Sequence, residues 1–215
     1  MSFGLVHQFN NYRAGSPPSF LQAANPVTKT DADCGATVTL SFPTTPTAGQ
    51  FLVINAVNTI GAVSAPPGWT EQGTPNSACQ TFTKIASGSE SNAYDFIYNG
   101  SSKSDAMSIV GAKYSGVFAT PIDVSASSSN TRTAPSVTTT QANELIMITA
   151  GSIVSATDYT TLPSGFTLAS SNVAGTCIAV ITHKAQIVAG ASGTNDFNTG
   201  SYANAKVSTF GVRSQ

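Results

Sequence analysis

Short apolar or alternating runs recur along the chain, separated by clusters of Gly, Pro, Asn and Ser. In Thr37–Phe42 the apolar residues alternate with polar ones, whereas Phe51–Val57 is apolar almost throughout. These patterns are typical of half-buried and fully buried strands, respectively. Further strands are predicted at Thr81–Ala86, Ala93–Tyr98, Met107–Tyr114, Glu144–Thr149, Cys177–Ala185 and Lys206–Val212. Because helical periodicity is nearly absent, we predict an all-β fold, an antiparallel, jelly-roll-like β-sandwich.

The second half of the chain repeats landmarks of the first half in the same order. FLVINAV, beginning at Phe51, matches ELIMITA, beginning at Glu144, and the aromatic residues of PPGWT and PSGFT match as Trp69 and Phe166. The other matched pairs are Cys79 with Cys177, Lys84 with Lys184, NGS at Asn99 with TGS at Thr199, and SIVG at Ser108 with STFG at Ser208. We therefore expect Trp69 and Phe166 to be equivalent core residues.

This repeat predicts a β-sandwich over residues 36–215, built from two related halves at about 36–120 and 121–215. Two copies of a long unit indicate duplicated sheet motifs rather than a solenoid. The halves could form two layers of one sandwich or two linked sandwiches. One sandwich is favoured, because neither half is expected to hold enough strands to close alone.

Residues 1–35 lie outside the matched landmarks and are predicted to form an N-terminal arm. Its scattered apolar side chains include Phe3, Leu5, Val6, Phe9 and Phe20. Each is worth roughly 1.5–3 kcal/mol when fully removed from water. The arm is therefore expected to dock on its own sandwich or on a neighbouring subunit, and to make most of the contact in a homo-oligomer.

The composition restricts the partners that this protein can have. Charged residues make up only 9% of the chain, against about 25% in typical globular proteins, so Ser, Thr, Asn and Gln must cover much of the surface. The net charge is −1, from 9 basic and 10 acidic residues. No basic field is available for phosphate backbones or anionic lipid, so neither nucleic acid nor a membrane is an expected partner.

The N-terminus lacks the cationic start and apolar stretch of a secretory signal. A secreted-type composition without an export signal is expected of a virion protein that is made in the host cytoplasm and released by lysis. A chain trimmed of its signal would give the same pattern.

Candidate catalytic and metal-binding residues are few. The three cysteines, Cys34, Cys79 and Cys177, form no C-x-x-C pair and are predicted to be buried free thiols. His183 is read as a plain sheet residue, and no hydrolase, phosphate-binding or dinucleotide motif occurs.

The carboxylates also give little sign of catalysis. Glu144 and Asp95 are both interpreted as solvent-facing, so no catalytic carboxylate pair is expected. Asp31 and Asp33 fit a turn better than a calcium loop. We therefore expect a protein that is not an enzyme and that binds no cofactor or metal.

Aromatic residues leave a second function open, since tyrosines can stack on sugar rings. The residues to consider for glycan contact are Tyr94, Tyr98, Tyr114, Tyr159 and Tyr202. Core packing is favoured over ligand contact both for this set and for Trp69, whose counterpart is the purely apolar Phe166.

Several phrases resemble a Ser/Thr-rich β-sandwich domain of bacteriophage structural proteins and bacterial surface proteins. They are PPGWT, KYSGV followed by PIDVSAS, APSVTTT, and PSGFT, and the similarity spans roughly Leu52 to Val212. The resemblance implies a virion protein, a capsid decoration (cement) or head-fibre subunit that binds the major capsid protein or tail components. The alternative is a carbohydrate- or receptor-binding module of a tail fibre or cell-surface protein. It supplies no catalytic residues, and fold analogy alone does not fix function.

Overall fold

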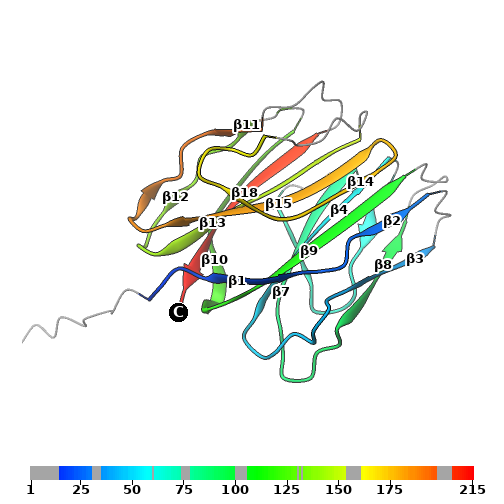
Figure 1. Cartoon of the computed structure of the whole chain (residues 1–215), viewed down its shortest axis with the longest axis horizontal. Coiled ribbons are helices and arrows are strands. Elements are labelled where there is room, and N and C mark those ends of the chain that lie inside the picture. Colours follow the sequence, from blue (N-terminus) through cyan, green and yellow to red (C-terminus); the bar gives the residue numbers. More distant parts are fainter. Residues whose placement is uncertain are drawn as a thin grey trace, which may run out of the picture.

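The computed structural model describes residues 15–30, 35–59, 61–73, 78–99, 106–129, 131, 133–153, 161–197 and 205–215. All regular secondary structure in these ranges is β-strand, and every strand pair is antiparallel. The described part of the chain has no helix that is long and apolar enough to cross a bilayer. The prediction of an all-β sandwich is confirmed (Figure 1).

The first large sheet comes entirely from the first half of the chain. In spatial order it contains β1 (Ser19–Ala23), β9 (Met107–Ser115), β4 (Phe51–Asn58), β7 (Cys79–Ile85) and β6 (Thr70–Gln72). A short strand, β2 (Val27–Lys29), also pairs with β9. The central strand β4 is buried along its whole length, which explains its nearly unbroken apolar sequence.

The second large sheet comes from the second half and repeats this order. It contains β10 (Val117–Ser129), β18 (Lys206–Ser214), β13 (Glu144–Ser152), β15 (Cys177–Gln186) and β14 (Thr167–Ala174). Each strand takes the place of one in the first sheet, with β13 at the centre as β4 is. Trp69 directly precedes the edge strand β6, and Phe166 directly precedes the edge strand β14, so the two aromatic residues occupy equivalent positions.

The strand pairing also shows where the sequence match is out of register. The matched lysines Lys84 and Lys184 lie opposite Leu52 and Ile146, respectively. Leu52 is therefore the counterpart of Ile146, not of Leu145 as the alignment of FLVINAV with ELIMITA predicted. The repeat in the central strands runs one residue later than expected.

The edge strands β1 and β10 are a further equivalent pair that the sequence did not predict. Phe20 of β1 lies opposite Tyr114, and Ile122 of β10 lies opposite Val212. The register then shifts at the same place in both strands, directly after Phe20 and directly after Ile122. A bulge at a sheet edge bends the strand and blunts its open side.

The two large sheets pack face to face and form the central sandwich. Their shared core draws on both halves, with Phe51 and Val53 from β4 and Met147 from β13 among its members. The prediction of one sandwich is therefore correct for these two layers. A polar contact also crosses the core, because Asn55 Nδ2 donates hydrogen bonds to the carbonyl oxygens of Ala150 at 2.8 Å and Val180 at 3.3 Å.

Each half also covers the outer face of its own sheet, which was not expected. In the first half a sheet of β3 (Thr37–Ser41), β8 (Ala93–Tyr98) and β5 (Val63–Ser64) encloses a second apolar core. In the second half two short ribbons pair β11 (Thr133–Ala134) with β17 (Asn195–Asp196), and β12 (Thr138–Thr139) with β16 (Gly190–Ala191). They lie over a third core. Each half thus holds more strands than its large sheet alone.

The predicted boundaries also need correction. The arm cannot extend to residue 35, because β1 and β2 pair with β9 and belong to the first sheet. The halves meet at Gly116, which adopts a φ of 71° between β9 and β10, rather than at residues 120–121. Of the arm residues, Phe20 lies in β1, whereas Phe3, Leu5, Val6 and Phe9 lie outside the described residues.

Candidate functional site

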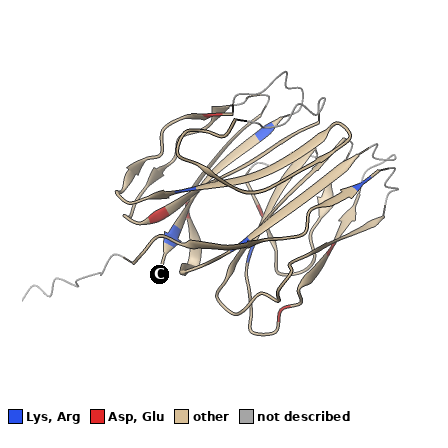
Figure 2. Cartoon of the chain, viewed as in Figure 1, with Lys and Arg blue, Asp and Glu red and all other residues tan. Residues whose placement is uncertain are grey.

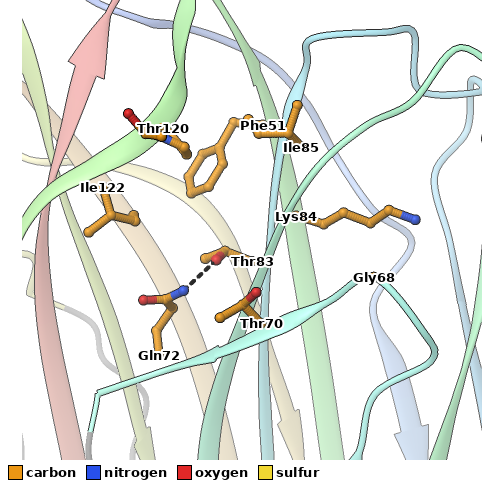
Figure 3. A pocket seen from close by; sticks show the side chains of 10 residues that line it. Phe51, Gly68, Thr70, Gln72, Thr83, Lys84, Ile85, Thr120 and Ile122 are labelled. Carbon is orange, nitrogen blue, oxygen red and sulfur yellow. Dashed lines mark hydrogen bonds between the residues drawn. The ribbon is translucent and has the colours of Figure 1, made fainter.

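A hollow of about 270 Å³ lies between the two halves, where β6 and β7 of the first sheet face β10 of the second (Figure 3). We call it the inter-half hollow. Its apolar lining includes Phe51, Ile85 and Ile122, and the Phe51 ring points into it. Its polar lining includes Gln72 and Thr120.

The polar side of the hollow is held in place by local contacts. Gln72 Nε2 donates a hydrogen bond of 2.8 Å to Thr83 Oγ1, the contact drawn in Figure 3. Gly68, at the turn before β6, has a φ of 86°, which favours glycine. A Cβ at Gly68 would lie 3.5 Å from the Lys84 side chain, so the turn and the lysine are closely packed.

Lys84 lines the hollow, but its charge is engaged elsewhere. Its Nζ lies 3.0 Å from Glu90 Oε2, which also accepts a hydrogen bond of 2.9 Å from the Tyr94 hydroxyl. Burial raises the pKa of Glu90, but hydrogen bonds from Ser87, Lys84 and Tyr94 outweigh this and bring the pKa to about 2. Glu90 is therefore ionised at neutral pH and holds the Lys84 ammonium beside it.

The equivalent place, where β14 and β15 of the second sheet face β1 of the first, is filled by aromatic rings. The Phe20 ring stacks on the His183 ring at a centroid distance of 5.4 Å and meets the Tyr114 ring edge-on at 5.6 Å. The Tyr114 hydroxyl also lies 3.3 Å from His183 Nδ1. Burial lowers the pKa of His183 below 6.5, so the imidazole is neutral at neutral pH.

The residues at the same three positions around the inter-half hollow are smaller. The counterparts of Phe20, His183 and Tyr114 are Ile122, Thr83 and Val212. Three aromatic or heteroaromatic rings are thus replaced by two aliphatic side chains and a threonine. Phe51 is the counterpart of Leu145. It is the larger of the two but makes up only part of the volume of the missing rings. The hollow results from this difference between the repeats.

A second cluster of ionisable groups surrounds Glu144 at the start of β13. Asp123 accepts hydrogen bonds from Arg213, at 3.0 Å from Nε and 2.7 Å from Nη2, and from the backbone N–H of Thr140 at 2.8 Å. Burial raises the pKa of Asp123, but these hydrogen bonds outweigh it and hold the pKa below 3.8. Glu144 accepts from the backbone N–H of Gln141 at 3.2 Å.

The prediction that Glu144 faces solvent is wrong, because its side chain is fully buried. Burial raises the pKa of Glu144 to about 7, and the negative charge of Asp123 also acts to raise it. The pair can thus retain one proton near neutral pH. Asp95, the other carboxylate expected to face solvent, is exposed. Within the described residues, no group of three or more His, Cys, Asp or Glu side chains could hold a metal ion.

The structure also corrects the candidate glycan contacts. Tyr94, Tyr98 and Tyr114 are buried, with at most 6% of their surface exposed, so none of them can present a ring face to a sugar. Tyr159 and Tyr202 lie outside the described residues. An alternating strand has two faces, and the sequence alone did not show that both faces of these strands would be covered.

Trp69 and Phe166 differ in their immediate contacts. Trp69 meets the rings of Tyr94 and Phe96 edge-on, at centroid distances of 5.1 and 5.9 Å. Phe166 is buried, with Lys184 Nζ 4.8 Å from its ring centroid. Both residues therefore pack against their own half.

Cys79 and Cys177 are free and buried, and they lie on the equivalent strands β7 and β15. Burial raises the pKa of the Cys79 thiol to about 12. Cys34 lies outside the described residues.

Sequence reasoning did not identify the residues of the inter-half hollow. Gln72, Thr83 and Ile122 carry no motif, and each is an ordinary strand residue. The only signal was the repeat itself, in which a position that is aromatic in one half is small in the other. The chain matches no protein-family model, no curated protein and no solved structure.

Proposed function

We propose that this protein is a non-catalytic structural subunit of a bacteriophage particle, a capsid decoration (cement) or head-fibre subunit, that contacts neighbouring subunits through residues 1–14. One observation carries the proposal: the described strands fill the same five sheet positions in both halves without these residues. Because β1 already takes the place that β10 takes in the second half, the apolar side chains before Gly15 are not needed to complete either sheet. The apolar residues concerned are Phe3, Leu5, Val6 and Phe9.

The charge distribution supports a role inside an assembly. Figure 2 shows that the charged positions are few and spread over the ribbon, without a large patch of one sign. Two of the few basic residues are also engaged in ion pairs, Lys84 with Glu90 and Arg213 with Asp123. A protein with a net charge of −1 has little electrostatic repulsion between its copies, so association is not opposed.

An exposed apolar pair on the body adds to this argument. Ile187 and Val188 follow β15 directly and are 70% and 71% exposed. Adjacent aliphatic side chains left in water favour contact with another surface. The resemblance of the PPGWT and PIDVSAS phrases to bacteriophage structural domains supports a particle as the place of that contact.

Particle membership can be tested directly. Particles from a lysed culture that produces this protein would be purified on a density gradient and analysed by mass spectrometry. We expect the chain at a constant ratio to the main shell protein across the particle peak. A chain found only in the soluble fraction at the top of the gradient would refute the proposal.

The role of residues 1–14 needs a variant that leaves β1 intact. Replacing Phe3, Leu5, Val6 and Phe9 with Ala removes the apolar groups and does not touch Ser19–Ala23. We expect this variant to keep the melting temperature of the wild type but to lose self-association in sedimentation velocity and to dissociate from particles. Unchanged association would show that the contact lies elsewhere on the body.

A further inference from the structure

We propose that the inter-half hollow is the site that receives an aromatic side chain from residues 1–14 of a second copy of this chain. The inference rests on the proposed function, since it supplies the receptor for the segment that joins neighbouring subunits. The occupant is thus one named segment, and the residues that bind it are Ile85 and Ile122 on the apolar side and Gln72 and Thr120 on the polar side.

The lining suits an aromatic side chain carried on an extended peptide. Ile85 and Ile122, both partly exposed, offer an apolar surface, and the buried Phe51 ring is directed toward the space (Figure 3). The Gln72 amide and the Thr120 hydroxyl lie beside it and can exchange hydrogen bonds with backbone groups of the incoming chain. A buried aromatic anchor surrounded by polar contacts is the usual centre of a protein–protein contact.

The chain itself shows which kind of group fits this place. In the equivalent space, where β15 of the second sheet meets β1 of the first, lies the Phe20 ring, whose centroid is 5.4 Å from that of His183 and 5.6 Å from that of Tyr114. That ring is delivered by an edge strand, β1, that begins one residue before it. At the inter-half hollow the strand in the same position, β10, delivers only Ile122, and the aromatic volume is missing. An added phenylalanine would restore it.

The required side chains are present in the segment before Gly15, which includes Phe3 and Phe9. The segment joins the described residues at Gly15, which lies against the C-terminal Gln215. Gln215 lines a neighbouring hollow that shares Ile85 with the inter-half hollow. Fourteen extended residues can reach about 45–50 Å, enough to cross to an adjacent subunit.

A peptide-binding experiment tests the site. The receptor is the full chain with Phe3 and Phe9 changed to Ala, so that its own segment cannot compete. A synthetic peptide of residues 1–14 with a C-terminal fluorophore is titrated with this receptor, and binding is followed by fluorescence anisotropy. The filled variant adds Thr83→His and Ile122→Phe, which copies the equivalent residues His183 and Phe20 into the hollow.

A matched control makes the opposite exchange at the equivalent place, with Phe20→Ile and His183→Thr. It alters the same number of equivalent positions and leaves the hollow intact. We expect the receptor and the control to bind the peptide, and the filled variant to bind it at least tenfold more weakly. Circular dichroism and melting curves check folding, and Ile122→Phe alone serves if the double change unfolds the chain.

The outcomes separate this inference from the proposed function. Equal peptide binding by the filled variant, or no binding by the receptor, overturns the hollow as the site, even where the wild type self-associates in sedimentation velocity. If the peptide binds the hollow but the wild type stays monomeric at all concentrations, the segment occupies the hollow of its own chain. That result overturns both the second-copy occupant and the proposed contact between subunits.

Discussion

Replacing Glu144 with Gln should remove a pH-dependent loss of stability. The carboxyl group is fully buried, and its pKa rises from 4.5 to about 7 because of burial first and the Asp123 charge second. Glutamine keeps the shape of the side chain and an oxygen that can accept from the backbone N–H of Gln141. The variant therefore tests the charge of the group rather than its packing.

The direction of the effect follows from proton binding in the two states. In the unfolded chain Glu144 loses its proton near pH 4.5, whereas the folded protein keeps it until about pH 7. Below pH 4.5 both states hold the proton and no penalty exists. As the pH rises from 4.5 to 7 the folded state loses stability relative to the unfolded one, and above pH 7 the full penalty remains. A rise of this size in pKa corresponds to about 3 kcal/mol.

Two neighbouring groups must be separated from this effect. Asp123 has a pKa held below 3.8, so its stabilising contribution is complete above that value and constant between pH 5 and 8. His183 has a pKa lowered from 6.5 by burial, so folding opposes its protonation and stability rises with pH up to about 6.5. The contribution of His183 is the same in the wild type and in Glu144→Gln and cancels in the comparison. Asp123 hydrogen-bonds with Glu144, but it is ionised throughout pH 5–8 and adds no pH dependence in this range.

Urea denaturation at pH 5 and pH 8, followed by tryptophan fluorescence, measures the comparison. We expect Glu144→Gln to gain stability relative to the wild type as the pH rises. The difference in the free energy of unfolding, variant minus wild type, should be about 2–3 kcal/mol higher at pH 8 than at pH 5. If the difference in the free energy of unfolding between the two proteins is the same at both pH values, ionisation of Glu144 does not destabilise the fold, and the reasoning is refuted.

Three further predictions concern the central core. Gly151→Ala should destabilise the protein by about 1–3 kcal/mol in urea denaturation, because a Cβ there would overlap Val57 and lie 2.6 Å from Cys79 Sγ; unchanged stability would show that the sheets can separate to admit a methyl group. Asn55→Ala should cost a similar amount, since it removes two hydrogen bonds between the sheets and is fully buried; a neutral effect would mean that the polar contact is not needed. Cys79 and Cys177 should resist a thiol reagent in the native protein, whereas all three thiols should react in denaturant; rapid native reaction at either would contradict its burial.

The pattern of apolar residues predicted the buried strands well and the edge strands poorly. The eight strands predicted from the sequence are all present, and most of them lie inside a sheet with neighbours on both sides. Both β10 and β14 were missed, since they are edge strands and much of their surface is polar and partly exposed. β10 also contains Pro121, which is tolerated in a strand at an edge and argues against a central one.

The Glu144 cluster shows why a polar residue next to a turn was misread. Its sequence context, a polar residue just before an apolar strand, is the usual signature of an exposed strand start. Its burial depends on Asp123, 21 positions earlier, and Arg213, 69 positions later, which the second sheet brings together. No local pattern reports such a contact, so a buried carboxyl pair could not be predicted from the sequence.

The same physical limit explains why the inter-half hollow could not be found from the repeat. Strands β4 and β13 are buried on both faces, so their sequences are apolar at nearly every position and fit one another equally well after a shift of one residue. Only the pairing of Lys84 with Leu52, and of Lys184 with Ile146, fixes the register. Because the predicted arm also included β1, Phe20 was left outside the repeat. Its difference in size from Ile122 could therefore not be seen. Once the strand pairing shows which residues are equivalent, a smaller side chain at one of two equivalent positions marks unfilled space. Such a position in a sheet core is then a site to test.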